Sequence, residues 1–223
     1  MNRSAARIVR EYGPFPGVDK VHGVTYDGQH VWIATGDRLN AFDPVSGEML
    51  RSIDVAAQAG TTFDGQHLFQ IADDRIQKID PDSGRVLATI PAPGGGSGNS
   101  GLAWAEGTLW VGRYQDRKIL QVDPETGAIL RTIESTRFVT GVTWNDGELW
   151  HATWEDDESE LRHVDSHTGE VLESLEMPPG VYVSGLESDG DDQFFCGGGT
   201  SGKVRAVRRS RRDAQAPVES ANE

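Results

Sequence analysis

Hydrophobic and polar residues alternate with a period of two along most of this chain, in short runs that Gly, Asp or Pro interrupt. The runs "EMLRSIDV" at 48–55 and "AILRTIES" at 128–135 show the pattern. Because successive side chains of a β-strand point to opposite faces, this period predicts short strands joined by tight turns. The chain also holds 27 glycines in 223 residues, a share well above the usual figure of about 7%, which disfavours an all-helical fold.

The strands belong to a repeated unit. One segment recurs five times, as "GVTYDGQHVW" at 23–32, "GTTFDGQHLF" at 60–69, "GLAWAEGTLW" at 101–110, "GVTWNDGELW" at 141–150 and "GLESDGDDQF" at 185–194. A second block, with Asp and Gly four residues apart, follows the first four copies, as "DPVSG", "DPDSG", "DPETG" and "DSHTG". The copies begin roughly 40 residues apart, the length of a propeller blade. We therefore predict an all-β fold, a five-bladed β-propeller of four-stranded antiparallel blades.

The last unit contains only three strands and ends near Val207, whereas the N-terminal run Ala6 to Glu11 has no partner in its own unit. We expect the N-terminal strand to close the last blade, which would hide two strand edges. Residues 1–207 are then a single propeller domain. Residues 208–223, "RRSRRDAQAPVESANE", have no period and few apolar residues, so we predict a disordered C-terminal tail.

Loop lengths distinguish the two faces of the predicted propeller. The two turns inside each unit keep a constant spacing, whereas the loops between the second and third strands and the links between blades vary in length. Both variable connections lie on the same face of an antiparallel blade, and variable loops on a rigid scaffold are where binding sites occur. This variable face begins at the residues that precede the leading glycines, which are His22, Ala59, Ser100, Thr140 and Ser184.

Candidate site residues are those that depart from the repeat near this face. Glu187 is a carboxylate at a position where the other copies carry Thr25, Thr62, Ala103 and Thr143. An unpaired carboxylate near the axis is costly or has a raised pKa, so we expect Arg113 or His22 as its partner. The sequence leaves two interpretations of Glu187 open: a structural plug in the channel, or a functional carboxylate. The predicted catalytic residues are Glu187, His22 and Glu155, and the predicted ligand-binding residues are Arg113, Tyr114, Trp154, Asn99, Asp73 and His151.

The roles expected for Trp154, His151 and Cys196 rest on separate observations. Trp154 is the one tryptophan outside the repeat's aromatic positions, which favours a pocket wall. His151 aligns with both apolar and polar residues, so a hydrogen-bonded framework role competes with catalysis. Cys196 aligns with small or apolar residues and is expected to be a buried filler.

Composition limits the partners. The net charge of −14 argues against nucleic acid and against an acidic membrane surface, because both need a basic protein face. A single cysteine cannot form an internal disulfide, and the N-terminal segment has no apolar run typical of a signal peptide. These features predict a cytoplasmic protein; they leave the oligomeric state open.

The segments "YDGQHVWIATG" and "DPVSGEML" of the first unit, "LFQIADD" of the second, and "LWHATWEDD" and "VDSHTGEVL" of the fourth resemble the plant- and bacterial-type glutaminyl cyclases. The resemblance covers residues 21–207 and implies a five-bladed propeller that converts N-terminal glutamine to pyroglutamate. That family places a catalytic glutamate immediately before the second leading glycine, where this chain has Ala59. Its first-blade glutamine falls on His22 and its third-blade tryptophan on Ser100, whereas the Trp154 region matches.

Three functions follow from these observations. The first is a divergent glutaminyl-cyclase-like enzyme or binder that holds a small polar ligand in the funnel of the variable face, without the family's glutamate. The second is a non-catalytic propeller that recognises a peptide or protein partner. The third is a lactonase-like metal-dependent enzyme in which Asp73, Asn99 and Glu187 bind a divalent cation, so the cofactor is left open.

Overall fold

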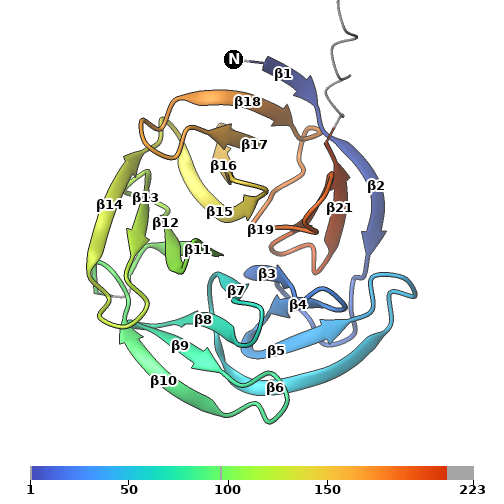
Figure 1. Cartoon of the computed structure of the whole chain (residues 1–223). Coiled ribbons are helices and arrows are strands. Elements are labelled where there is room, and N and C mark those ends of the chain that lie inside the picture. The colour runs from blue at the N-terminus through green and yellow to red at the C-terminus, as the bar shows by residue number, and fades with distance from the viewer. Residues whose placement is uncertain (1, 96, 210–223) are drawn as a thin grey trace, which may run out of the picture.

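The computed structural model describes residues 2–95 and 97–209, and it shows five antiparallel sheets arranged as blades around a central axis (Figure 1). The all-β, five-bladed propeller predicted from the repeat is confirmed. Each blade runs outward from an innermost strand that begins with, or contains, a leading glycine, except in blade 2, where Gly60 directly precedes β7. No helix able to span a membrane is found in the described part of the chain.

The first three blades are consecutive in sequence. Blade 1 consists of β3 (Gly23–Tyr26), β4 (Val31–Ala34), β5 (Gly36–Phe42) and β6 (Met49–Ala57). Blade 2 consists of β7 (Thr61–Phe63), β8 (Leu68–Ala72), β9 (Arg75–Ile79) and β10 (Val86–Pro91). Blade 3 consists of β11 (Asn99–Ala105), β12 (Thr108–Arg113), β13 (Lys118–Val122) and β14 (Ile129–Glu134).

The last two blades take up the N-terminal segment. Blade 4 consists of β15 (Phe138–Asn145), β16 (Glu148–Glu155), β17 (Glu158–Val164) and β18 (Val171–Glu176), with β1 (Asn2–Ala5) added at its outer edge. Blade 5 consists of β19 (Gly185–Ser188), β20 (Gln193–Gly197), β21 (Val204–Arg208) and β2 (Arg7–Tyr12). Closure of the last blade by the N-terminal strand is therefore confirmed.

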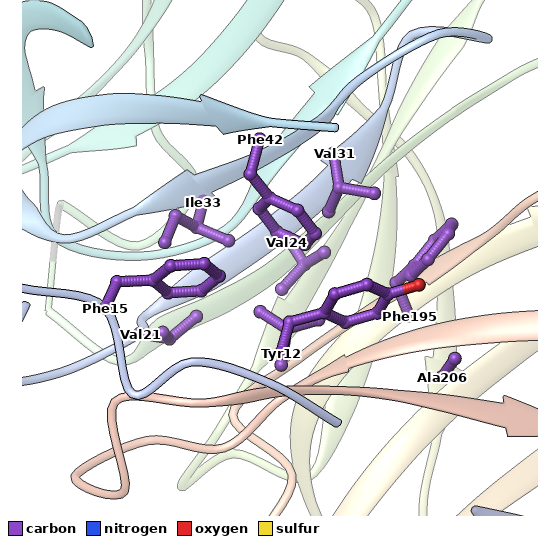
Figure 2. Close-up of a cluster of buried hydrophobic side chains, with 10 residues drawn as sticks. Tyr12, Phe15, Val21, Val24, Val31, Ile33, Phe42, Phe195 and Ala206 are labelled. Atoms are coloured by element: carbon purple, nitrogen blue, oxygen red, sulfur yellow. The ribbon is translucent and has the colours of Figure 1, made fainter. Parts of the chain in front are cut away.

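A hydrophobic cluster joins the closed blade to blade 1 (Figure 2). Tyr12 of β2 lies 4.9 Å from the ring of Phe42 in blade 1 and 6.4 Å from the ring of Phe195 in blade 5, measured between ring centroids. Because Tyr12 is almost fully buried, it links the N-terminal strand to the rest of blade 5 and to blade 1. The ring of blades is thus held shut by apolar packing as well as by strand pairing.

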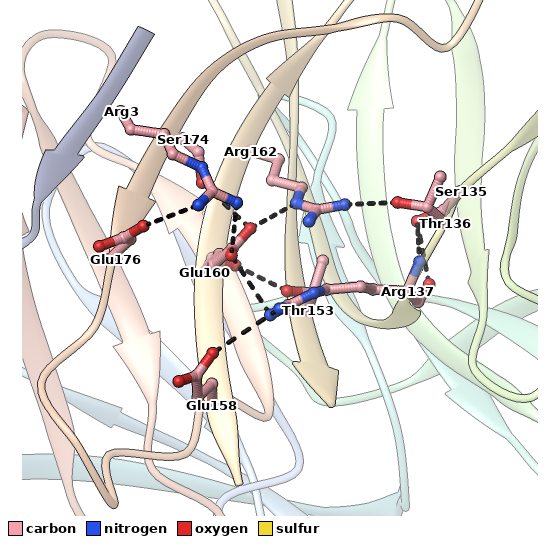
Figure 3. Close-up of polar contacts among 10 residues, drawn as sticks. All are labelled: Arg3, Ser135, Thr136, Arg137, Thr153, Glu158, Glu160, Arg162, Ser174 and Glu176. Carbon is pink, nitrogen blue, oxygen red and sulfur yellow. Dashed lines mark hydrogen bonds and ion pairs between the residues drawn. The ribbon is translucent and has the colours of Figure 1, made fainter. Parts of the chain in front are cut away.

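Strand β1 was not predicted. It pairs in parallel with β18, although its sequence "NRSA" has no apolar alternation. Arg3 anchors it, since its guanidinium lies 3.7 Å from the buried Glu160 and 3.4 Å from Glu176 (Figure 3). Glu160 also binds Arg162 at 2.6 Å and Arg137 at 3.3 Å. A charged cluster therefore holds this strand in place of an apolar face.

The Asp-to-Gly turns of the repeat have a common structure. In the first of them, Asp43 accepts the backbone N–H of Val45 through its side chain, and its carbonyl accepts the N–H of Gly47 at 2.7 Å. Gly47 has a φ of +81°, a conformation that glycine adopts without strain. The equivalent glycines 84, 127 and 169 also have positive φ. The Asp that accepts the hydrogen bonds and the Gly with positive φ are therefore both required, and both recur in the sequence.

The leading glycines form a closed ring around the axis. A Cβ at Gly101 would lie 2.3 Å from the backbone N of Val142, and a Cβ at Gly141 would lie 2.7 Å from that of Leu186. The same close approach continues from Gly185 to Gly23 and from Gly23 to Gly60. Five backbones therefore pack against one another where any side chain would clash.

The C-terminal end of the described chain is held by the fold. Strand β21 includes Arg208, one residue beyond the predicted domain boundary. Arg209 then pairs with Glu148 at 2.6 Å and with Glu173 at 2.7 Å, and its guanidinium lies over the ring of Trp150. The rest of the predicted tail, residues 210–223, lies outside the described residues.

Candidate functional site

A pocket opens on the variable face, above the ring of leading glycines. Its volume is about 270 Å³, and we call it the mouth pocket. All five residues that precede the leading glycines line it, as the repeat predicts. The complete lining consists of Lys20, His22, Gln58, Ala59, Gly98, Asn99, Ser100, Tyr114, Thr140, Tyr182 and Ser184. No Asp or Glu is among these described residues, so the wall is polar, aromatic and free of carboxylates.

Two polar atoms on this wall have no hydrogen-bond partner among the described residues. They are Thr140 Oγ1 and Asn99 Nδ2. The neighbouring hydroxyls differ, because Ser100 donates to the carbonyl of Val139 at 2.6 Å and Ser184 donates to that of Val21 at 2.6 Å. Buried polar groups are nearly always paired in folded proteins. Both atoms are buried within the wall, and they are candidate partners for a ligand in the pocket.

Arg113 fixes this wall from behind. One of its terminal nitrogens donates to the carbonyls of Pro93 and Ser97 and to Asn99 Oδ1 at 3.1 Å, and the rest of the guanidinium pairs with Asp116. The side chain is largely buried. Because Arg113 holds Asn99 Oδ1, the amide nitrogen of Asn99 is left as the free group. Arg113 therefore supports the loop before β11, and it is not among the residues that line the pocket.

His22 is the base on the wall. Its backbone N–H donates to the carbonyl of Ala34 at 2.8 Å, which continues the β3–β4 pairing and fixes the residue at the pocket edge. Burial, together with the positive charge of Lys20, lowers the pKa of His22 below its ordinary value. A neutral imidazole can accept a proton. Of the described lining residues, His22 is the one whose ordinary pKa lies near neutrality.

Aromatic rings form one side of the mouth. Tyr114 lines the pocket and stacks on Phe138, with centroids 4.9 Å apart. Tyr182 also lines the pocket and meets Trp154 edge-on, again at 4.9 Å. Trp154 therefore contacts the pocket wall through Tyr182 and is not itself a lining residue. Sequence reasoning missed Tyr182 because it lies in the link before β19, where the repeat has no equivalent position.

Glu155 lies farther out, next to Trp154 on β16, and is not a lining residue. Its Oε1 accepts a hydrogen bond from Arg117 at 2.6 Å, and the Arg117 guanidinium lies over the ring of Phe138. Its second oxygen, Oε2, is buried without a partner among the described residues. Glu155 is thus bonded to Arg117 and lies outside the pocket lining, whereas His22 is part of that lining.

Glu187 lies on the other side of the glycine ring from the mouth pocket. Its carboxylate accepts hydrogen bonds from Thr25 Oγ1 at 2.6 Å, from Thr143 Oγ1 at 2.5 Å and from the backbone N–H of Ser188. The expected partners, Arg113 and His22, do not bond to it, because the ring of backbones separates them from this level of the channel. Burial raises the pKa of Glu187 to about 7 against these hydrogen bonds, although the side chain keeps some contact with solvent in the channel.

The remaining candidates lie apart from the pocket. Asp73 is in the exposed two-residue turn between β8 and β9, with a φ of +51°. His151 is fully buried on β16, and burial lowers its pKa to about 4, which supports its framework reading. Cys196 is buried in a hydrophobic cluster, and burial raises the pKa of its thiol. Cys196 is therefore a packed filler, as predicted.

The predicted cation ligands do not converge. Asp73 is in an exposed turn, Asn99 is on the pocket wall and Glu187 is on the far side of the glycine ring. Within residues 2–95 and 97–209, no group of three or more His, Cys, Asp or Glu side chains is placed to hold a metal ion. The three residues therefore do not form the shared site that the metal-dependent reading requires.

Comparisons with known proteins agree with this fold and with the sequence resemblance. Residues 131–197, from within β14 to the end of β20, match the family model for glutamine cyclotransferase. The crystal structure of Myxococcus xanthus glutaminyl cyclase superposes with a TM-score of 0.76.

The chain resembles the glutaminyl cyclases. The Myxococcus match covers 93% of this chain and 97% of that protein at 17% identity, so the glutaminyl-cyclase-like propeller extends over nearly the whole molecule. A search of curated proteins found no match. The matched family segment includes Thr140, Trp154 and Tyr182, which places one side of the mouth pocket within the region of sequence similarity.

Proposed function

We propose that the mouth pocket of this glutaminyl-cyclase-like propeller binds the N-terminal residue of a peptide, and that it recognises a carbonyl oxygen of that residue. The observation that carries the proposal is the pair of unpaired groups on the wall, Thr140 Oγ1 and Asn99 Nδ2. A hydroxyl and an amide N–H both donate to a carbonyl oxygen. Leaving such groups unsatisfied costs about 1–3 kcal/mol each, so a ligand that pairs with them gains specificity.

The charge of the pocket wall indicates which type of N-terminal residue the pocket binds. The described lining residues include no carboxylate, and their one full positive charge is that of the exposed Lys20. A side-chain carboxamide, as in glutamine, offers a carbonyl oxygen without bringing a charge into the cavity. We therefore take an N-terminal glutaminyl peptide as the ligand, in line with the activity named for the Myxococcus protein.

His22 supplies the acid–base step for turnover. In cyclisation, the neutral α-amine attacks the side-chain carbonyl carbon, the new C–N bond closes the ring, and the bond to the amide nitrogen breaks. His22 accepts the proton that the amine loses and returns it to the departing nitrogen, which leaves as ammonia. The lowered pKa of His22 keeps the imidazole able to accept this proton at neutral pH. Turnover is therefore expected to fall on the acid side, as His22 becomes protonated.

The test uses the dipeptide Gln-Gly-amide, with affinity measured by calorimetry and cyclisation measured by ammonia release. Thr140→Val removes one donor at constant volume. Asn99→Asp removes the other donor and keeps an acceptor for Arg113. Each substitution should weaken binding by about tenfold, because one hydrogen bond contributes about 1 kcal/mol or more. His22→Gln should retain binding and lose at least a hundredfold in turnover.

Outcomes separate the two parts of the proposal. Binding of Gln-Gly-amide that is unchanged in both Thr140→Val and Asn99→Asp would overturn the assignment of the pocket. Turnover that persists in His22→Gln would overturn the role of His22 alone. As a control, Leu172→Ala alters an exposed leucine on the outer strand of blade 4 and should change neither quantity.

A further inference from the structure

Four aromatic side chains on the variable face have no place in the hydrophobic core. They are Tyr114, Phe138, Trp154 and Tyr182, and each is only partly buried. Every other Trp, Tyr and Phe of the chain belongs to, or packs against, one of five clusters of buried hydrophobic residues. Core packing therefore explains the other aromatic positions and leaves these four without an explanation.

The four rings form one continuous surface, which we call the aromatic shelf. Tyr114 stacks on Phe138, and Phe138 is the cross-strand partner of Trp154 in the β15–β16 pairing. Trp154 in turn meets Tyr182 edge-on, at a centroid distance of 4.9 Å. Tyr114 and Tyr182 line the mouth pocket, whereas Phe138 and Trp154 are not among its lining residues. The shelf thus starts at the pocket and continues away from it.

Polar groups border the outer part of the shelf. The guanidinium of Arg117 lies 4.5 Å from the centroid of the Phe138 ring and donates to Glu155 Oε1. The other carboxylate oxygen, Glu155 Oε2, is buried and has no partner among the described residues. An apolar surface with a polar border is typical of a binding site.

We infer that the aromatic shelf binds the second residue of the peptide whose first residue occupies the mouth pocket, and that it selects an apolar or aromatic side chain there. This inference rests on the proposed function. Continuity supports it, because the same two tyrosines belong to the pocket and to the shelf. The distances support it as well. An extended peptide advances about 3.3–3.6 Å per residue, which is less than the 4.9 Å between the ring centroids of Tyr114 and Phe138 or of Trp154 and Tyr182.

The chemistry of the surface favours a peptide with a ring or branched apolar group at that position. Phe and Trp side chains bury large areas and gain from offset or edge-on contacts with other rings. The partial exposure of Trp154 and Phe138 leaves apolar surface for such a contact. A glycine at the second position would leave it uncovered. The shelf therefore distinguishes peptides that share the same first residue.

The test compares Gln-Phe-amide with Gln-Gly-amide on the whole protein, by calorimetry, or by kcat/KM where the probe is cyclised. The wild-type protein should prefer Gln-Phe-amide by about tenfold. Trp154→Ala should reduce that preference, taken as the ratio of the two values, to about twofold or less. Trp154→Phe, which restores a ring, should recover most of the preference.

Two further variants distinguish the shelf from the pocket. Thr140→Val should weaken both probes equally and keep their ratio, because it alters the subsite of the first residue. Leu172→Ala should leave both values unchanged. If Trp154→Ala does not fold, the wild-type ratio and Trp154→Phe still decide the inference.

The failures are distinguishable. Binding of Gln-Gly-amide with no preference for Gln-Phe-amide would overturn the shelf and leave the proposed function intact. A preference that survives in folded Trp154→Ala would also overturn it. If neither probe binds the wild-type protein, the proposed function and the inference both fail.

Discussion

The mouth pocket and the axial carboxylate lie on the same innermost strands, yet their polar groups are satisfied in opposite ways. Ser184 lines the pocket and Glu187 lies three residues further along β19, about 10 Å away in an extended strand. Glu187 has three hydrogen-bond donors from this chain. Thr140 and Asn99, at the mouth, each keep one polar atom unpaired. The glycine ring between the two levels separates a carboxylate that this chain satisfies from the two unpaired groups near the mouth.

The largest effect on stability is expected when the backbone packing of the glycine ring is disrupted. A Cβ at position 101 would lie 2.3 Å from the backbone N of Val142 and 2.6 Å from the backbone carbon of Gly141. Backbone atoms cannot yield as a flexible side chain does, so Gly101→Ala should lower the free energy of unfolding by about 3 kcal/mol or more. Denaturant unfolding measures this.

Gly190→Ala is the matched control for that variant. Gly190 has a φ of +89° and no atom within 4 Å of an added Cβ, so only backbone strain opposes the change. A loss of about 1 kcal/mol is expected. Equal losses in the two variants would show that the ring contact contributes nothing beyond ordinary glycine strain.

The next effect concerns the charge of Glu187. Its pKa is raised by burial to about 7 in the folded protein, from 4.5 for the free side chain. The folded state therefore binds this proton more tightly, and the free energy of unfolding should fall as pH rises from 4.5 to 7, by at most about 1.4 kcal/mol per pH unit. Glu187→Gln should remove this decline and be more stable than wild type at pH 8.

Glu160 provides the opposite case. Burial raises the pKa of its carboxyl, but the hydrogen bond and charge of Arg162, together with Arg137, outweigh that effect and lower it. Its stabilising contribution is therefore present above pH 4.5 and is lost as pH falls through the lowered value. Glu160→Gln should destabilise the protein at pH 7. A change of the pH profile in the same direction in both Gln variants would contradict these two assignments.

A smaller effect is expected at Arg113, which supports the mouth and is not among the pocket-lining residues. Arg113→Ala removes the hydrogen bonds that hold Pro93, Ser97 and Asn99 and should cost about 1–3 kcal/mol of stability. It should also weaken Gln-Gly-amide binding, because Asn99 loses its orientation. Arg113→Lys should not rescue the loss, since an ammonium lacks the planar fork. Unchanged stability with loss of binding to carboxylate ligands alone would restore the role predicted from sequence.

Much of the fold could be predicted because each blade repeats the same backbone requirements. The Asp43 and Gly47 turn needs a side-chain acceptor and a residue with positive φ, and both recur in sequence. The unpaired run at 6–11 predicted the closure of blade 5. Strand β1 could not be predicted, because Arg3 holds it through a charged contact to Glu160 that leaves no apolar pattern.

The site could be predicted only as far as the repeat extends into it. Alignment of the units placed His22 and Thr140 at the mouth, where both line the pocket. It also placed Glu187 at the axis, but the contact between glycine backbones that separates it from the mouth has no signature in residue spacing. Tyr182 lies in a blade-to-blade link without counterparts, so its position depends on a path that only the structure shows.

A crystal structure of the protein with Gln-Gly-amide would decide whether the mouth pocket binds the first residue of the peptide. We predict that the first residue lies in the mouth pocket, with its side-chain carbonyl oxygen within hydrogen-bond distance of Thr140 Oγ1 and Asn99 Nδ2. Glu187 should keep its bonds to Thr25 and Thr143. A dipeptide bound beside Glu187, or bound at the mouth with both donors still unpaired, would contradict this prediction.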